Sequence, residues 1–190
     1  MSLAPNTETN SAPEAPPTIS PEGTAEEAAT AASQDARQFI SFQVGEQEYG
    51  VDIMAVREIK GWTMVTKLPN TPEFVRGVLN LRGVIVPIFD LRCRFGMGKT
   101  DATKLHVVII VTVQERTIGI LVDAVSDILT ATADQIRPVP EMDGEQNEGF
   151  LDGLVTVEER MVALIAIEGL FDSKMVAAAA NALAELNPTD

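Results

Sequence analysis

The sequence predicts a mainly β fold, either a sandwich or a pair of small barrels. Short runs of apolar and β-branched residues recur along the 190-residue chain, and glycine and proline turns separate them at close spacing. No apolar run approaches the roughly 18 residues that a membrane-spanning helix requires. Propensity alone does not choose between the sandwich and the barrels, so both stay open at this point.

The N-terminal segment, Met1–Arg37, is predicted to be a disordered tail. It is rich in Pro, Ala, Ser, Thr and Glu, and it carries six acidic residues and one base. Such a composition cannot bury enough apolar surface to offset the entropy lost on ordering. We therefore expect the folded part to begin at Gln38, and deletion of Met1–Ala36 to leave the melting temperature nearly unchanged.

The first part of the folded region is expected to form strands around one short helix. Apolar residues alternate with polar ones in Gln38–Val44, which indicates a strand, and Glu48–Val51 is its return strand. Asp52 is a good N-cap, and the spacing predicts a helix over Ile53–Ile59. Another strand is expected at Met64–Leu68.

Two apolar runs, Val78–Leu81 and Val84–Phe89, flank the pair Arg82-Gly83 and predict a β-hairpin. The runs are almost continuously apolar, so both faces of these strands are expected to be buried. Pro87 cannot donate to a strand ladder, and its presence indicates an edge or a bulge in the second run.

The rest of the chain is predicted to contain one helical turn, two more hairpins and a terminal helix. The expected elements are a turn at Leu91–Phe95 capped by Asp90, a hairpin of Leu105–Val113 and Thr117–Asp123, a segment through Leu129, a hairpin of Val155–Val157 and Met161–Ile167, and an Ala-rich helix at Ser173–Leu186.

The segment Asn80–Gly83 and the residues VIVPIFDLR that follow it resemble the central signature of the CheW family, the adaptor proteins of bacterial chemosensory arrays. Further similar segments follow in the same order between Arg37 and Asp172: EYGVDIMAVREI, LPNTPEF, GILVDAVSDIL, IRPVPE and LDGLVTVEERMVALIAIEGL. The resemblance implies two intertwined, five-stranded SH3-like barrels over residues 38–172. Residues 1–37 are then a tail, and 173–190 a C-terminal helix with its end.

Charge and cysteine content exclude several classes of function. The formal net charge is −14, so the basic surface that a nucleic-acid-binding protein needs is missing, and an anionic membrane would repel the chain. Cys93 is the only cysteine, which rules out an internal disulfide. The N-terminus has no signal-peptide pattern. A soluble cytoplasmic protein without direct membrane insertion is expected.

Catalytic, cofactor and metal sites are not predicted. Gly98-Lys99-Thr100 has the end of a phosphate-binding loop, but Cys93 stands where that motif needs a glycine, so a surface loop is expected. His106 is the only histidine and is expected to be structural, and Cys93 to be a half-buried apolar residue. The acids of Glu141–Glu148 lack the spacing of a calcium loop.

Arg82 and Glu58 are the strongest candidate site residues. They could form a charge pair that locks the hairpin to the short helix, or they could bind partners, and both can hold. The resemblance implies a set of positions at or beside the partner-binding surfaces, with Gly77 and Gly83 acting first on backbone geometry: Val56, Glu58, Gly77, Asn80, Arg82, Gly83 and Val107. For Val107, burial in the core is the alternative interpretation.

The function that the resemblance implies is a non-catalytic scaffold recruited to membrane-associated receptor arrays. It would join the regulatory domain of the histidine kinase CheA to the cytoplasmic tip of methyl-accepting chemoreceptors. The alternative is a detached CheA-regulatory-like or CheV-like binding module of a non-flagellar chemosensory pathway. A small hydrolase or nucleotide enzyme is disfavoured, because the phosphate-binding loop, a second histidine and a metal cluster are missing from the sequence.

Overall fold

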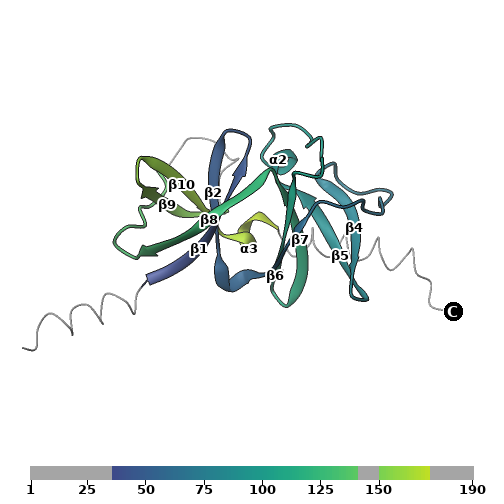
Figure 1. Ribbon diagram of the computed structural model, residues 1–190, viewed down its shortest axis with the longest axis horizontal. Helices are drawn as coiled ribbons and strands as arrows, with labels where there is room; N and C mark the ends of the chain where they lie inside the picture. The colour runs from purple at the N-terminus through teal and green to yellow at the C-terminus, as the bar shows by residue number, and fades with distance from the viewer. Residues whose placement is uncertain (1–35, 141–149, 172–190) are drawn as a thin grey trace, which may run out of the picture. The chain divides into compact units, whose positions relative to one another are not determined.

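The computed structural model describes residues 36–140 and 150–171. These residues form two five-stranded sheets with three single-turn helices, as the mainly β prediction requires (Figure 1). The predicted C-terminal helix at Ser173–Leu186, the acidic loop and nearly all of the predicted tail lie outside the described residues. Among the described residues, no helix is long and apolar enough to cross a membrane.

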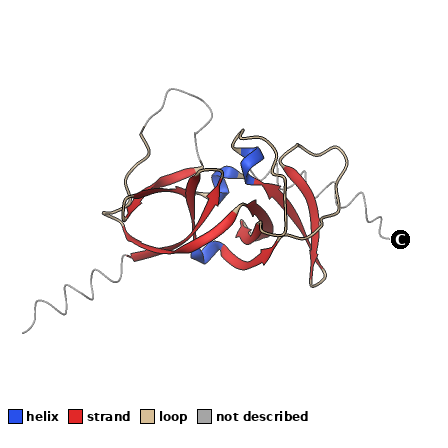
Figure 2. Cartoon of the chain, turned by 45° about the horizontal axis from the view of Figure 1, so that its top comes forward, coloured by secondary structure: helices blue, strands red, loops and turns tan. Residues whose placement is uncertain are grey.

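The first sheet, which we call barrel A, has the strand order β8-β1-β2-β10-β9. All neighbouring strands in it are antiparallel except β2 and β10, which are parallel. Figure 2 shows the strands of this sheet curving round into a ring. Its strands are β1 (Ala36–Val44), β2 (Gln47–Asp52), β8 (Ala124–Thr132), β9 (Leu151–Val157) and β10 (Arg160–Ile165).

The second sheet, barrel B, has the order β3-β6-β7-β5-β4 and repeats the same pairing pattern. Its one parallel pair, β5 with β7, again lies between the fourth and third strands of the order. Its strands are β3 (Val56–Gly61), β4 (Val75–Leu81), β5 (Val84–Asp90), β6 (Val107–Val113) and β7 (Arg116–Val122).

The helix predicted over Ile53–Ile59 is wrong beyond its first turn. Asp52 does cap a helical turn, since its carboxylate accepts a hydrogen bond from the Met54 backbone N–H at 2.9 Å. However, that turn is the 3-10 helix η1 (Ile53–Ala55), and from Val56 the chain is extended and pairs with β6. The β-branched Val56 and Ile59 suit a strand, and burial alternates along β3, so that Ile59 faces solvent.

The strand predicted at Met64–Leu68 is reduced to one bridge. Thr66 and Val78 exchange backbone hydrogen bonds of 2.9 and 2.8 Å, and no other residue of that stretch pairs in a ladder. The central hairpin is confirmed as β4 and β5. Pro87 lies outside the β5–β7 ladder, which begins only at Ile88, so its missing N–H costs no hydrogen bond there.

The helical turn after the hairpin is confirmed as α2 (Leu91–Arg94), with the Asp90 carboxylate accepting from the Cys93 N–H at 3.1 Å. The two later hairpins are also confirmed, as β6–β7 and β9–β10. A third single turn, α3 (Ile167–Leu170), follows β10.

Three apolar clusters explain why so many strands lack a polar face. One cluster comes from barrel A alone and includes Phe39 and Leu164, and another comes from barrel B alone and includes Val86 and Ile110. The largest cluster takes buried residues from both barrels, for example Phe42 and Phe89. Strands such as β6 and β7 are therefore buried on both faces, one inside their barrel and one against the other barrel.

Candidate partner-binding site

All seven residues of the predicted site belong to barrel B. Val56 and Glu58 lie on β3, Gly77 and Asn80 on β4, and Val107 begins β6, while Arg82 and Gly83 form the turn between β4 and β5. The strands β3 and β4 are the two edges of this sheet, and the Arg82–Glu58 contact joins them.

The predicted charge pair is present. Arg82 Nη2 lies 3.3 Å from Glu58 Oε2. The pair locks the hairpin to a strand, β3, and not to the helix that the sequence predicted. Arg82 nevertheless leaves 86% of its side chain exposed. An exposed pair of this kind contributes on the order of 0–1 kcal/mol to folding. Because the side chain is mostly exposed, most of the guanidinium remains accessible to a partner.

The turn residues hold Arg82 in place. Both central residues have positive φ, +53° at Arg82 and +88° at Gly83, which is the backbone of a tight hairpin turn that follows the twist of its strands. The Asn80 side-chain oxygen accepts a hydrogen bond of 2.8 Å from the Gly83 N–H. Asn80 and Gly83 therefore position the arginine at the tip of the hairpin.

The hairpin tip is not buried on both faces, contrary to the prediction. Val84 and Ile85 are exposed, and only the later residues of β5 are buried. The reason is that β5 gains its second neighbour, β7, only from Ile88 onward, so the tip extends beyond the rest of the sheet. The result is an arginine, a residue type enriched at protein interfaces, flanked by exposed aliphatic side chains whose apolar area a partner could bury.

Gly77 is required by a close backbone approach. Its φ is +136°, and a Cβ atom there would lie 2.2 Å from the Thr66 carbonyl oxygen. The pairing of β4 with β5 also shifts register between Val75 and Gly77. Any side chain at this position would push the Thr66 bridge away from β4, so the role of Gly77 is in the backbone.

Val56 and Val107 contribute to packing. Both are half-buried and pack against the cluster that the two barrels share. They lie on paired strands, but Val56 is opposite Val111 and Val107 is opposite Gly61, so they stand at different ends of the β3–β6 pair. For Val107, the geometry matches the core-burial interpretation.

The exposed Ile59, Val84 and Ile85 were missed by the sequence reasoning. For Ile59 the local signal was misleading, because this residue lies three positions after Val56, which is the spacing of one helix face. For Val84 and Ile85 no local signal was available, since their exposure follows from how far β5 extends beyond β7.

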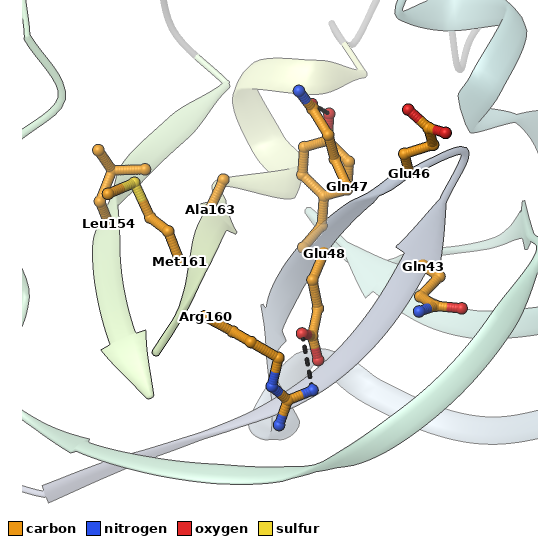
Figure 3. A pocket seen from close by; sticks show the side chains of 9 residues that line it. Gln43, Glu46, Gln47, Glu48, Leu154, Arg160, Met161 and Ala163 are labelled. Carbon is orange, nitrogen blue, oxygen red and sulfur yellow. Dashed lines mark hydrogen bonds and ion pairs between the residues drawn. The ribbon is translucent and has the colours of Figure 1, made fainter. Parts of the chain in front are cut away.

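A pocket of about 520 Å³ opens on barrel A, and an ion pair lies among its lining residues (Figure 3). Arg160 Nη1 donates to Glu48 Oε2 at 3.1 Å, and the Tyr49 hydroxyl donates to Gln47 Oε1 at 2.7 Å. Burial raises the pKa of Tyr49. A carboxylate, an arginine and a protonated phenol supply no activated nucleophile, and the lining contains no Ser, Cys or His.

The residues considered for chemistry take structural roles among the described residues. His106 Nδ1 accepts from the Thr103 N–H at 3.0 Å, and its Nε2 lies 3.5 Å from Asp123 Oδ1. Burial, together with the nearby Asp90 and Glu73, raises the pKa of Cys93, which opposes thiolate formation. No group of three His, Cys, Asp or Glu that could hold a metal ion is present in the described part of the chain.

The expectation for Gly98-Lys99-Thr100 needs one correction. Lys99 is exposed, but Thr100 is buried, and both its N–H and its hydroxyl donate to the Asp90 carboxylate, at 2.9 and 2.7 Å. A buried carboxylate is costly unless it accepts hydrogen bonds, and Thr100 is buried because it supplies two of them to Asp90.

The family model of the CheW-like domain matches residues 38–175. The chain belongs to the CheW-like family. A probable chemotaxis protein CheW of Rhizobium etli is 46% identical over 139 residues, which are 73% of this chain and 90% of that protein. The chemotaxis protein CheW of Klebsiella aerogenes is 46% identical over 141 residues, 74% of this chain and 85% of that protein.

A solved structure is also similar. The scaffolding protein TtCheW of Thermoanaerobacter tengcongensis superposes with a TM-score of 0.67 at 34% identity, covering 73% of this chain and 94% of that one. This similarity confirms the predicted pair of SH3-like barrels. The chain is thus a scaffold protein of the chemotaxis signalling class.

Proposed function

We propose that the chain is a non-catalytic adaptor that couples the histidine kinase CheA, through its regulatory domain, to the cytoplasmic tip of methyl-accepting chemoreceptors. It would act in the cytoplasm, recruited to membrane-associated receptor arrays. The observation that carries the proposal is the CheW-like family match over residues 38–175, which spans both barrels. Its proposed partner-binding region consists of Val56, Glu58, Gly77, Asn80, Arg82, Gly83 and Val107.

The arrangement of barrel B supports this role. Arg82 is presented by a fixed turn, is mostly exposed, and is flanked by the exposed Val84 and Ile85. A rigid body whose two barrels share one apolar cluster can hold two partners in a fixed relation. Such an adaptor passes on receptor state only through different affinities for the receptor's states, and it needs no chemistry of its own.

Reconstitution tests the proposal directly. The purified chain is combined with the kinase and receptor-containing membranes, and both kinase phosphorylation and co-sedimentation of the kinase are followed as the chain is titrated. We expect the chain to bind the regulatory domain with about micromolar affinity, worth about −8 kcal/mol, and to bind receptor fragments more weakly, because an array gains strength from many linked contacts.

The coupling role is wrong if the kinase fails to sediment with receptors in the presence of the chain and its activity stays constant across the titration. Binding of the kinase without receptor coupling would instead indicate a competitor of the adaptor. A chain boiled before addition is the matched control for nonspecific sedimentation.

A further inference from the structure

Barrel B carries a second feature that is separate from the predicted site. A pocket of about 490 Å³ lies between the segment that joins β3 to β4 and the loop that follows α2. None of the seven predicted site residues lines it. Its lining combines cations with an apolar surface: Trp62, Met64, Val65, Lys67, Leu68, Thr71, Pro72, Glu73, Val75, Arg76 and Lys99.

Arg76 is held rigidly at this pocket. Its Nη1 donates to the Thr100 carbonyl oxygen at 2.9 Å and lies 3.5 Å from Asp90 Oδ2, and its guanidinium carbon sits 5.6 Å from the centre of the Trp62 ring. Asp90 is in turn fixed by the two hydrogen bonds from Thr100. The side chain of Arg76 is therefore only 15% exposed and cannot swing freely.

The other donors of Arg76 are unused. Among the described residues, its Nε and Nη2 have no hydrogen-bond acceptor, and neither belongs to the buried polar atoms that lack a partner. Solvent therefore reaches these N–H groups. A planar guanidinium that is already immobilised, with donors left free, suits a carboxylate, because little side-chain entropy is lost on binding.

Two lysines add to the positive charge. Lys67 and Lys99 are exposed and form no ion pair with any described residue, while Glu73 is the one acid of the lining. The whole of barrel B shares this sign, since residues 53–122 contain ten Lys and Arg against five Asp and Glu. A cationic surface of this kind steers acidic partners toward it.

The apolar part of the lining limits what such a partner can be. Met64 is almost completely exposed, and Trp62 is half-buried beside the cations. A free inorganic anion would leave these side chains in water. We propose that this pocket binds an acidic segment of a partner protein, with a carboxylate on Arg76, Lys67 and Lys99 and a neighbouring apolar side chain covering Trp62 and Met64.

Trp62 is the only tryptophan of the chain and supplies a direct readout. The full-length protein is titrated with a capped peptide of glutamate pairs separated by leucines, and with a matched peptide in which glutamines replace the glutamates. Emission of Trp62 and a parallel calorimetric titration report binding. We expect saturable binding of the glutamate peptide that weakens with added salt, and none of comparable strength for the glutamine peptide.

Paired substitutions locate the site. Lys67→Gln with Lys99→Gln should weaken the glutamate peptide about tenfold, whereas Lys104→Gln with Arg116→Gln should change its affinity less than about twofold. The control pair removes the same charge from exposed positions of the same barrel that do not line the pocket. Arg76 itself is left in place because its loss would unpair Asp90.

Equal binding of both peptides would show that only apolar contact is involved and would overturn the proposal. An equal loss in both paired variants would also overturn it, because the effect would then be the general charge of barrel B. The inference does not depend on kinase–receptor coupling, since the peptide assay contains neither protein.

Discussion

Barrel A and barrel B have the same order of antiparallel and parallel pairs, yet their charges are opposite. Residues 53–122, which include barrel B, hold ten basic and five acidic residues, whereas the described residues of barrel A, 36–52, 123–140 and 150–171, hold three basic and ten acidic ones. The backbone pattern and the shared apolar cluster do not explain this difference, because neither requires surface charge. The barrels are therefore alike in backbone and different in charge, and the acidic segment proposed for the Arg76 pocket would meet the more basic of the two.

Truncation of either interior should destabilise the whole body and gives the largest expected effect. Leu164→Ala empties part of barrel A, and Ile110→Ala part of barrel B; both side chains are fully buried. Each should lower the free energy of unfolding by about 2–5 kcal/mol. Because one apolar cluster joins the barrels, urea unfolding should remain a single transition.

Trp62 packs against the interior cluster of barrel B, so its fluorescence reports the unfolding of that barrel. If Leu164→Ala in barrel A moves the unfolding midpoint seen by Trp62 fluorescence as much as that seen by circular dichroism, the barrels unfold together. A Trp62 curve that stays in place would show that they are independent units.

Two glycines of barrel B should respond differently to the same added methyl group. Gly77→Ala places a Cβ 2.2 Å from the Thr66 oxygen at φ +136°, and we expect a loss of about 2–4 kcal/mol. Gly83→Ala also has positive φ, but nothing lies within 4 Å of the new atom, so about 1 kcal/mol is expected. Denaturant unfolding of the two variants measures both values, and equal losses would show that backbone strain alone, and not the contact with Thr66, decides the cost.

The sequence predicted most strands, because apolar β-branched runs and turn residues are local signals. The Asp90 cap and the hairpin around Arg82-Gly83 follow from such signals and are confirmed. The helix over Ile53–Ile59 failed because pairing with a distant strand outweighed a local spacing that fits one helix face. The β6 edge decided the outcome by pairing with β3, and that edge lies about fifty residues further along the chain.

The sequence predicted individual residues of the candidate site, but not the features that depend on how separate segments are placed. The contact of Arg82 with Glu58 was expected, but the exposure of Val84 and Ile85 depends on where the β5–β7 ladder begins. The Arg76 pocket was not predicted, because it joins Trp62, Arg76 and Lys99 from three separate segments. Contacts that depend on tertiary placement leave no pattern in one stretch of sequence.

The two barrels each carry an arginine–glutamate pair, and loss of either pair should have the smallest effect on stability. Arg160 pairs with Glu48, whose side chain is only 10% exposed and whose Oε1 is buried without a hydrogen-bond partner. Arg160→Ala leaves that carboxylate with no cation, so we expect a loss of about 1 kcal/mol after allowing for the half-exposed arginine. Arg82→Ala frees the more exposed Glu58 to be hydrated, and we expect at most about 0.5 kcal/mol.

Binding should reverse the order of these two variants. Arg82 is presented at the hairpin tip beside exposed aliphatic side chains, so its truncation should cost about 2 kcal/mol of binding to the kinase regulatory domain or the receptor. Arg160→Ala is the matched control and should bind like the parent. Thermal unfolding and calorimetric titration of both proteins separate the two effects. An Arg82→Ala protein that unfolds, or one that binds like the parent, would remove Arg82 from the binding surface and leave it as a structural charge of barrel B.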